Sequence, residues 1–479
     1  MQGKRVSKYK VEFDRTGKMK VPAALYASES LKIEDSAIRQ LLDAAALTGV
    51  RKVIGTPDLH HGYGVPIGSV VALEGTICPA AVGYDINCGM RLLTTPLERG
   101  DVDVVEMTQS LRRDIPLGEG KSNVRMNKND FRLVLEKGVS ALREIKRKDH
   151  RVWEGFNLDE THADMQAIEE HGSMDGDTAA VSERAFERGI SQLATLGGGN
   201  HFIEIQVVER VLDEKIGERF GLHPNQIVVM IHSGSRGLGH EIGGHYMRIS
   251  KQKTRDSSPN PSLTYLPLDD REAQRYIKAM HAAANFAFVN RHLMAALVRK
   301  NFRHEFGDIA MPTVYDVPHN MAKLETHGGE DYWVHRKGAT RAFDAARMKD
   351  TPYADVGQPV LIPGSMGTAS YVLVGTPTAD ESLFSVNHGA GRTMSRTAAT
   401  GRRPGWGKRR REKRQEAAIS DSDFKRAMRG IHLVCADKRS IKEEAPQAYK
   451  DIDEVIETVV GADLAVAVAR LKPLAVLKG

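Results

Sequence analysis

The chain has 479 residues, 41% of them hydrophobic, so it is long enough to bury a large core. Its three cysteines cannot build a disulfide framework, its first ten residues lack the apolar core of a signal peptide, and no apolar run could cross a bilayer. We therefore expect a cytoplasmic protein that does not enter membranes. The formal net charge of +6 fits an anionic partner such as nucleic acid or a nucleotide, without identifying one.

The first part of the chain is predicted to mix strands with one helix. Residues 11–21 are expected to be extended, and apolar spacing over 33–47 predicts a helix. A glycine- and proline-rich loop is expected over 57–68. Short strands are predicted at 53–54, 69–73 and 90–94.

The middle of the chain is predicted to be mainly helical. Segments 102–113, 131–148 and 179–193 each carry an apolar stripe and a charged outer face, which indicates a peripheral helical layer. A long amphipathic region over 269–302 contains His281 and His292, which we interpret as ordinary helix-face residues. Strands and helices mix without regular alternation. We therefore expect an α+β fold, with central β-sheets, peripheral helices and glycine-rich active-site loops at strand ends.

A carboxylate and a thiol stand three residues apart in the loop that joins two of the predicted strands. Asp85 offers a hard oxygen, and Cys88 offers a soft sulfur that becomes a good ligand as the thiolate. Gly83 and Gly89 flank the pair and allow the backbone to turn tightly. The pair is suited to bind a cation, although a buried cysteine near an aspartate is by itself more often structural.

Four histidines stand at the ends of predicted strands in glycine- or proline-flanked loops; the first precedes its strand and the other three follow theirs. They are His201, His232, His319 and His388. One such histidine is usually structural, but four of them together with Asp85 and Cys88 favour a metal site with oxygen, nitrogen and sulfur ligands. His60 and His61 are expected to line the pocket or to stand behind the ligands.

Several cationic residues stand next to glycine or other small residues, an arrangement suited to phosphate binding. They are Arg236, Arg392 and the basic cluster 335–341, and the loop 363–371 adds hydroxyls and backbone donors. The chain lacks the phosphate-loop pattern, a dinucleotide fingerprint and the lysine-centred motif of ordinary nucleotidyl-transferring ligases. A covalent nucleotide, if one forms, must therefore be carried by a histidine.

Taken together, these motifs closely resemble the RtcB-type RNA-splicing ligases, from about residue 57 to the C-terminus. The motifs that carry the resemblance occur in the family's order: PDLHHGYGVPIG, GYDINCGM, GGGNHFIEI, HSGSRG, HRKGATRAF, GSMGTASY, NHGAGR and PLAVLKG. The resemblance implies one large RtcB-like domain over 1–479. It also implies an enzyme that uses GTP and Mn²⁺ to join an RNA 3′-phosphate or 2′,3′-cyclic phosphate end to a 5′-hydroxyl end, in tRNA splicing or RNA repair.

The resemblance also assigns roles to individual residues. Two Mn²⁺ ions would be held by Asp85, Cys88, His201, His232 and His319, with the Cys88 thiolate between them. Ligand softness alone would suggest Zn²⁺ or Fe²⁺, so the choice of manganese comes from the resemblance. His388 would take GMP from GTP. The guanylate pocket would contain Asn200, Phe202, Glu204, Ser365, Ser370, Gly389, Ala390, Gly391, Tyr449 and Lys478, and phosphates would be held by Arg236, Lys337 and Arg392.

Other interpretations stay open at this point. A dinuclear-metal phosphoesterase would use the same Asp, Cys and His residues to activate water. A non-catalytic RNA-binding protein is disfavoured, because every position of the site is present. The basic segment 402–414 is expected to be a surface loop that either clamps RNA, with Trp406 available for stacking, or is merely solvated. The physiological RNA, a requirement for an archease-type activator and the oligomeric state also stay open.

Overall fold

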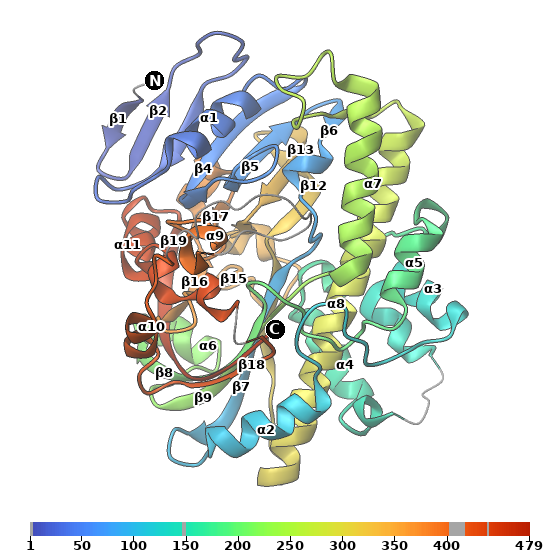
Figure 1. The fold of residues 1–479 in the computed structure, drawn as a ribbon, viewed down its shortest axis with the longest axis vertical. Coiled ribbons are helices and arrows are strands. Elements are labelled where there is room, and N and C mark those ends of the chain that lie inside the picture. The colour runs from blue at the N-terminus through green and yellow to red at the C-terminus, as the bar shows by residue number, and fades with distance from the viewer. Residues whose placement is uncertain (1–2, 146–149, 402–416, 438–439) are drawn as a thin grey trace.

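The computed structural model describes residues 3–145, 150–401, 417–437 and 440–479 (Figure 1). Two large β-sheets form its centre, and long helices lie along one side. This mixture of sheets and helices confirms the predicted α+β class. The predicted basic loop 402–414 lies outside the described residues.

The first sheet has seven strands and contains the N-terminal part of the chain. Adjacent strands run antiparallel except for β3 and β4, which are parallel. Helix α1 (Asp35–Ala44) packs against β4 through Leu41 and other apolar residues. The strands, in their order across the sheet, are β1 (Lys4–Ser7), β2 (Lys10–Phe13), β3 (Ala23–Tyr26), β4 (Val50–His60), β5 (Ile67–Leu73), β13 (Glu330–Lys337) and β12 (Asn320–His327).

The second sheet has eight strands and carries most of the histidine loops at one end. Its order is β11 (Thr313–Pro318), β7 (Gly89–Glu98), β9 (Gln226–Ser233), β8 (Phe202–Val211), β19 (Ala465–Lys478), β16 (Ser370–Gly375) and β15 (Pro359–Ile362), with β18 (His432–Cys435) parallel to β19. Two short pairs complete the sheets: β6 (Thr76–Ile77) with β10 (Leu266–Pro267), and β14 (Ala339–Arg341) with β17 (Ser385–Asn387).

The helices of the middle of the chain gather around one long helix, α8 (Arg271–Phe306), as Figure 1 shows. The other α-helices are α2 (Val104–Asp114), α3 (Lys128–Lys137), α4 (Leu158–Gln166), α5 (Glu183–Gly189), α6 (Glu214–Arg219), α7 (Arg236–Thr254), α9 (Arg396–Thr400), α10 (Asp421–Ala427) and α11 (Ile452–Gly461). Within the described ranges, no helix has both the length and the apolar character that crossing a membrane requires.

Helix α8 is not amphipathic along its middle, contrary to the sequence prediction. Residues 282–299 are all buried, because the helix runs between the second sheet and the surrounding helices. His292 is therefore not an ordinary helix-face residue. Arg91 lies 3.0 Å from its Nδ1 and Thr161 lies 3.1 Å from its Nε2, in a buried network that also contains Asp164.

Several predicted segments have different bounds in the structure, and four of them differ most. Strand β4 continues through residues 57–60, which we expected to be a loop, and only β2 within 11–21 is a strand. The helix expected over 131–148 ends at Lys137, because Gly138 has a φ of +60° and is followed by a 3₁₀ helix up to Arg143; residues 146–149 lie outside the described ranges. Within 179–193, only Glu183–Gly189 is α-helical, and Ser182 caps its start.

Candidate functional site

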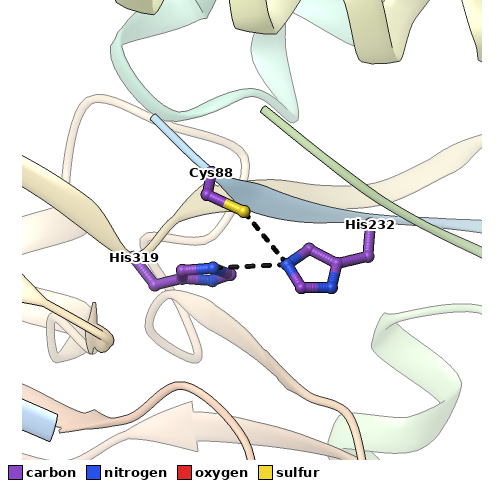
Figure 2. Close-up of side chains that lie close together, drawn as sticks. All are labelled: Cys88, His232 and His319. Carbon is purple, nitrogen blue, oxygen red and sulfur yellow. Dashed lines mark hydrogen bonds between the residues drawn. The ribbon is translucent and has the colours of Figure 1, made fainter. Parts of the chain in front are cut away.

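Cys88 stands beside two buried histidines at the end of the second sheet (Figure 2). Its Sγ lies 3.2 Å from Nε2 of His232, which in turn lies 3.3 Å from Nε2 of His319. These three ligand atoms lie close enough together to hold one metal ion. Neutral imidazole nitrogens and a thiolate are ligands that divalent transition metals accept.

On its other side, Cys88 belongs to a second group of potential ligands. Its Sγ lies 3.3 Å from Nε2 of His201, and that nitrogen lies 2.8 Å from Oδ2 of Asp85. Asp85, Cys88 and His201 form a second set that could hold a metal ion. The Cys88 sulfur therefore belongs to both sets.

Strand register brings these residues together from distant parts of the sequence. Gly89, which follows Cys88, pairs with Ser233 on β9 and with Pro318 on β11. The neighbours of those two residues are His232 and His319. On the next strand of the sheet, Phe202 pairs with His232 and follows His201 directly. The expected delivery of histidines at strand ends is therefore seen for these residues.

The buried guanidinium of Arg291 on α8 ties two of the ligand-bearing segments together. Its Nη1 donates to the carbonyl oxygens of Asn87 and Ser233, each at 2.8 Å, which fixes the backbone beside Cys88 and beside His232. Its charge is balanced by Asp316, whose Oδ1 accepts from Nη2 at 2.7 Å. The ligand segments thus rest on a rigid, fully buried support.

The rings of His201 and His232 are oriented so that Nδ1 faces a backbone carbonyl and Nε2 faces the sulfur of Cys88. Nδ1 of His201 lies 3.0 Å from the carbonyl oxygen of Leu196, and Nδ1 of His232 lies 3.1 Å from that of Asn200. A hydrogen on Nδ1 would satisfy these carbonyls and leave Nε2 free to bind a metal. Burial lowers the pKa of His232 well below its usual value, which favours the neutral form.

The two ligand candidates that are not histidines, Asp85 and Cys88, have pKa values shifted in opposite directions. Burial opposes ionisation of Asp85, but the neighbouring His201 and Arg236 outweigh it, so the pKa of this carboxyl lies below its usual range. Burial and the Asp85 charge raise the pKa of the Cys88 thiol well above its ordinary value when no cation is near. The thiolate therefore needs a cation, which is the chemistry expected of a metal ligand.

His388 follows β17 and contacts a carboxylate that sequence reasoning missed. Its Nδ1 lies 2.5 Å from Oδ2 of Asp58, which is completely buried and also accepts from the Thr56 hydroxyl at 2.6 Å. Burial opposes ionisation of Asp58, yet His388 and Thr56 lower its pKa below the usual value. The aspartate stands in the motif PDLHH, but the expected loop over 57–68 gave no reason to place it against His388.

The segment around Asp58 is fixed by another buried cation. Lys450 Nζ donates to the carbonyl oxygens of Pro57 and Leu59, each at 2.9 Å. Gly391 lies so close to this segment that an added Cβ would stand 2.3 Å from the carbonyl oxygen of Asp58. Asp58 and the His388 loop are therefore held in one arrangement.

His388 and four of the five metal-ligand candidates face one cavity of about 680 Å³; the fifth, His201, is buried and is not in its wall. The ring centroid of His388 lies 4.9 Å from that of His319 and 6.3 Å from that of His60. His60 and His61 line the cavity, as expected. The other predicted residues in its wall are Asp85, Cys88, Asn200, Phe202, His232, His319, Lys337, Ser365, Gly389, Ala390, Gly391, Arg392, Tyr449 and Lys478.

Two residues assigned to the guanylate pocket, Glu204 and Ser370, are buried beside the cavity and are not in its wall. Gln206 connects them, because its Nε2 donates to Glu204 at 2.6 Å and to Ser370 at 3.0 Å. Glu204 follows Phe202 by two residues on β8, so both point to the same face of the strand. Burial raises the pKa of Glu204 to about 8.

Two of the three cations expected to hold phosphates are already bound to protein groups. Lys337 Nζ donates to the carbonyl oxygens of Tyr63 (2.5 Å) and Ala80 (3.1 Å), and burial lowers the pKa of this lysine to about 8. Arg392 donates to the hydroxyl of Tyr449 at 3.1 Å. Arg236 lies behind the ligand group, with Nη1 3.4 Å from Nδ1 of His201. Their contact with phosphate stays a prediction.

Comparison with known proteins agrees with the motifs. Residues 40–479 match the family model described as tRNA-splicing ligase RtcB. The chain is 44% identical to the tRNA-splicing ligase RtcB of Pyrobaculum aerophilum, with 96% of this chain and 95% of the relative covered. It is 42% identical to that of Thermococcus kodakarensis (99% and 98%) and 38% identical to the RNA-splicing ligase RtcB homolog 1 of Entamoeba dispar (93% and 82%).

Proposed function

The chain belongs to the RtcB family of tRNA-splicing ligases, and on that premise we propose that it joins an RNA 3′-phosphate or 2′,3′-cyclic phosphate end to a 5′-hydroxyl end at the expense of GTP. One observation carries the proposal. A histidine whose Nδ1 is held by a buried carboxylate faces the same cavity as four of the five metal-ligand candidates. This arrangement supports a histidine nucleophile for nucleotide transfer.

In the first step, Nε2 of His388 attacks the α-phosphorus of GTP. A bond forms between nitrogen and phosphorus, the bond to the bridging oxygen breaks, and pyrophosphate leaves. Nε2 must be unprotonated to attack, and the contact between Nδ1 and Asp58 favours the tautomer with hydrogen on Nδ1. The Asp58 carboxylate also stabilises the positive charge that develops on the ring as the bond forms.

In the following steps, the GMP group moves from His388 to the RNA. An oxygen of the RNA 3′-phosphate attacks the phosphorus of the histidine adduct, which frees the imidazole. The 5′-hydroxyl of the second RNA end then attacks the activated 3′-phosphate, and GMP leaves as the strand is sealed. A 2′,3′-cyclic phosphate would first be hydrolysed to the 3′-phosphate in the same cavity.

Two Mn²⁺ ions would be held by Asp85, Cys88 and His201 on one side and by Cys88, His232 and His319 on the other. Bound there, they would neutralise negative charge on the phosphoryl oxygens and polarise the phosphorus. The donor set of one carboxylate, one thiol and three imidazoles fits such ions. Arg291 and the backbone carbonyls of Leu196 and Asn200 orient these donors.

Glu204 is proposed to select guanine. A carboxylate accepts hydrogen bonds from N1 and N2 of guanine, and adenine lacks both donors at that edge. Phe202, on the same strand face, lies in the cavity wall, and Lys478 Nζ lies 5.7 Å from the centre of its ring. A guanine that passes Phe202 and Lys478 would approach Glu204.

Glu204→Gln is expected to lower the preference for GTP over ATP by roughly 10- to 100-fold, because one charge-assisted pair of hydrogen bonds is lost. The measurement is the rate of covalent labelling with each nucleotide. Since the pKa of Glu204 is about 8 and the ionised form accepts both guanine hydrogens, wild-type preference should rise as pH increases through that value. The glutamine variant should show no such rise, and an unchanged preference in this variant would refute the role of Glu204.

The proposed activity is tested by ligation of a 3′-phosphate RNA to a 5′-hydroxyl RNA. GTP is compared with ATP, and Mn²⁺ with Mg²⁺ and Zn²⁺, which examines substrate, nucleotide and metal together. We expect a sealed product only with GTP and the most product with Mn²⁺. Phosphate release without sealing would instead favour the dinuclear phosphoesterase, which uses the same ligands to activate water.

A further inference from the structure

Two exposed tyrosines form an aromatic row at the mouth of the cavity. Tyr63 is 43% exposed and Tyr84 is 37% exposed, and both line the cavity that His388 faces. Their ring centroids lie 6.0 Å apart, and the ring of Tyr84 stacks on His240 of α7 at 4.8 Å. Neither phenol group has a hydrogen bond to any residue in the described ranges. The two rings therefore present large apolar faces to solvent beside the reacting groups.

The row is held in place by the local backbone. Helix α7 has two consecutive glycines, Gly243 and Gly244, where Tyr84 lies against it. An added Cβ at Gly243 would stand 3.2 Å from Cα of Tyr84, and one at Gly244 would stand 3.7 Å from its Cε1. The carbonyl oxygen of Tyr63 accepts from Lys337. These contacts fix the backbone of Tyr63 and let Tyr84 lie close against α7.

The surroundings of the row favour an anionic, planar ligand. Tyr84 directly precedes Asp85 in the chain, so whatever contacts this ring lies next to the proposed metal ligands. Arg248, one turn beyond Gly244 on α7, has a side chain that is 64% exposed, and its Nη2 lies 3.9 Å from Oε1 of Glu241, so one side of the guanidinium is paired and the rest faces solvent. Aromatic faces beside an exposed guanidinium are the elements with which proteins bind single-stranded nucleic acid: bases stack on the rings and phosphates contact the cation.

We infer that Tyr63 and Tyr84 form a stacking platform for an unpaired nucleobase of the RNA, within a few nucleotides of the end that is joined, and that Arg248 contacts a neighbouring phosphate. This inference rests on the proposed function and adds a subsite to it. Stacking on a ring face does not distinguish one base from another, so the platform holds the strand without selecting its sequence. It would keep the RNA end in the cavity while His388 transfers GMP.

The test combines protein variants with RNA that lacks single bases. The double variant Y63L/Y84L removes the rings, Y63F/Y84F keeps them, and Tyr332→Leu is a control at a tyrosine that does not line the cavity. Each nucleotide near a 3′-phosphate end, and near a 5′-hydroxyl end, is replaced in turn by an abasic unit. The measurement is the dissociation constant of each RNA from wild type and from each variant.

We expect the leucine pair to bind intact RNA about 5- to 150-fold more weakly than wild type, since a stacked base contributes roughly that factor. The phenylalanine pair and the Tyr332 control should bind as wild type does. Removal of the stacked base should weaken RNA binding to wild type by a similar factor. The same abasic RNA should bind the leucine pair no more weakly than intact RNA does, because the rings that held the base are already gone. Arg248→Ala should remove about one phosphate contact, so the slope of log affinity against log salt concentration should become shallower by about one.

Two results would overturn the platform and leave the proposed function standing. They are equal affinity of wild type and the leucine pair for intact RNA, and an abasic series that wild-type protein binds uniformly. The abasic series uses only wild-type protein, so it tests the platform even if the leucine pair does not fold. Covalent labelling of His388 by GTP requires no RNA, so labelling of the wild-type protein tests the proposed function separately from the platform. A wild-type protein that neither binds nor ligates RNA would overturn both.

Discussion

Asp58→Asn is expected to slow covalent transfer of GMP to His388 by about 10²- to 10⁴-fold. The carboxylate lies 2.5 Å from Nδ1 of the histidine and is completely buried, so water cannot replace it. Asparagine has a similar shape but no charge, and its amide nitrogen can stabilise the wrong tautomer of the ring. The measurement is single-turnover labelling with GTP that carries the label on its α-phosphate.

A matched control distinguishes this effect from general damage to the fold. Glu325 is also a buried carboxylate, bound to Arg336 and His327, but it does not line the cavity. Unfolding midpoints measure how far Asp58→Asn and Glu325→Gln each destabilise the fold. At equal destabilisation, only the Asp58 variant should lose covalent labelling. Labelling of the Asp58 variant at the wild-type rate would mean that His388 does not depend on this carboxylate.

Cys88→Ala is expected to reduce Mn²⁺ affinity at both proposed positions and to abolish ligation, because the sulfur belongs to both ligand sets. Loss of a residue that merely orients a ligand costs about 10- to 100-fold in metal affinity, and loss of a shared ligand should cost at least as much. The measurement is Mn²⁺ bound per chain at increasing free metal, together with the ligation rate.

Cys78→Ser provides the control for this prediction. Cys78 is also buried, but its Sγ donates to the carbonyl oxygen of Thr264 at 3.2 Å, and serine can make the same hydrogen bond. This variant should bind Mn²⁺ as wild type does. If Cys88→Ala still binds two ions with unchanged affinity, the shared-thiolate arrangement is wrong.

Local patterns in the sequence predicted where the histidines stand relative to the strands. His201 directly precedes a strand, whereas His232, His319 and His388 stand at or directly after strand ends, and the structure places all four around one site. The pairing of β7 with both β9 and β11 could not be read from those local patterns. The resemblance to the family implied that these residues share one site, but it gave no strand pairing.

The contacts that sequence reasoning missed depend on tertiary packing. Proline and glycine over 57–68 indicated a loop, but β4 continues through His60 and buries Asp58 against His388. The polar residues of α8 suggested an amphipathic helix, yet Arg291 and His292 are buried because Asp316, Arg91 and Asp164 satisfy their polar groups. Such pairing between distant residues has no local signal in a single sequence.

The most direct test of the account is to locate the nucleotide adduct on the protein. The protein is incubated with GTP and Mn²⁺ and without RNA, digested under alkaline conditions that preserve a phosphoramidate, and analysed by mass spectrometry. We predict one GMP per chain, attached to His388, lost on treatment with acid and absent from His388→Ala. An adduct on another residue, or none in a protein that still ligates RNA, would contradict the proposed mechanism.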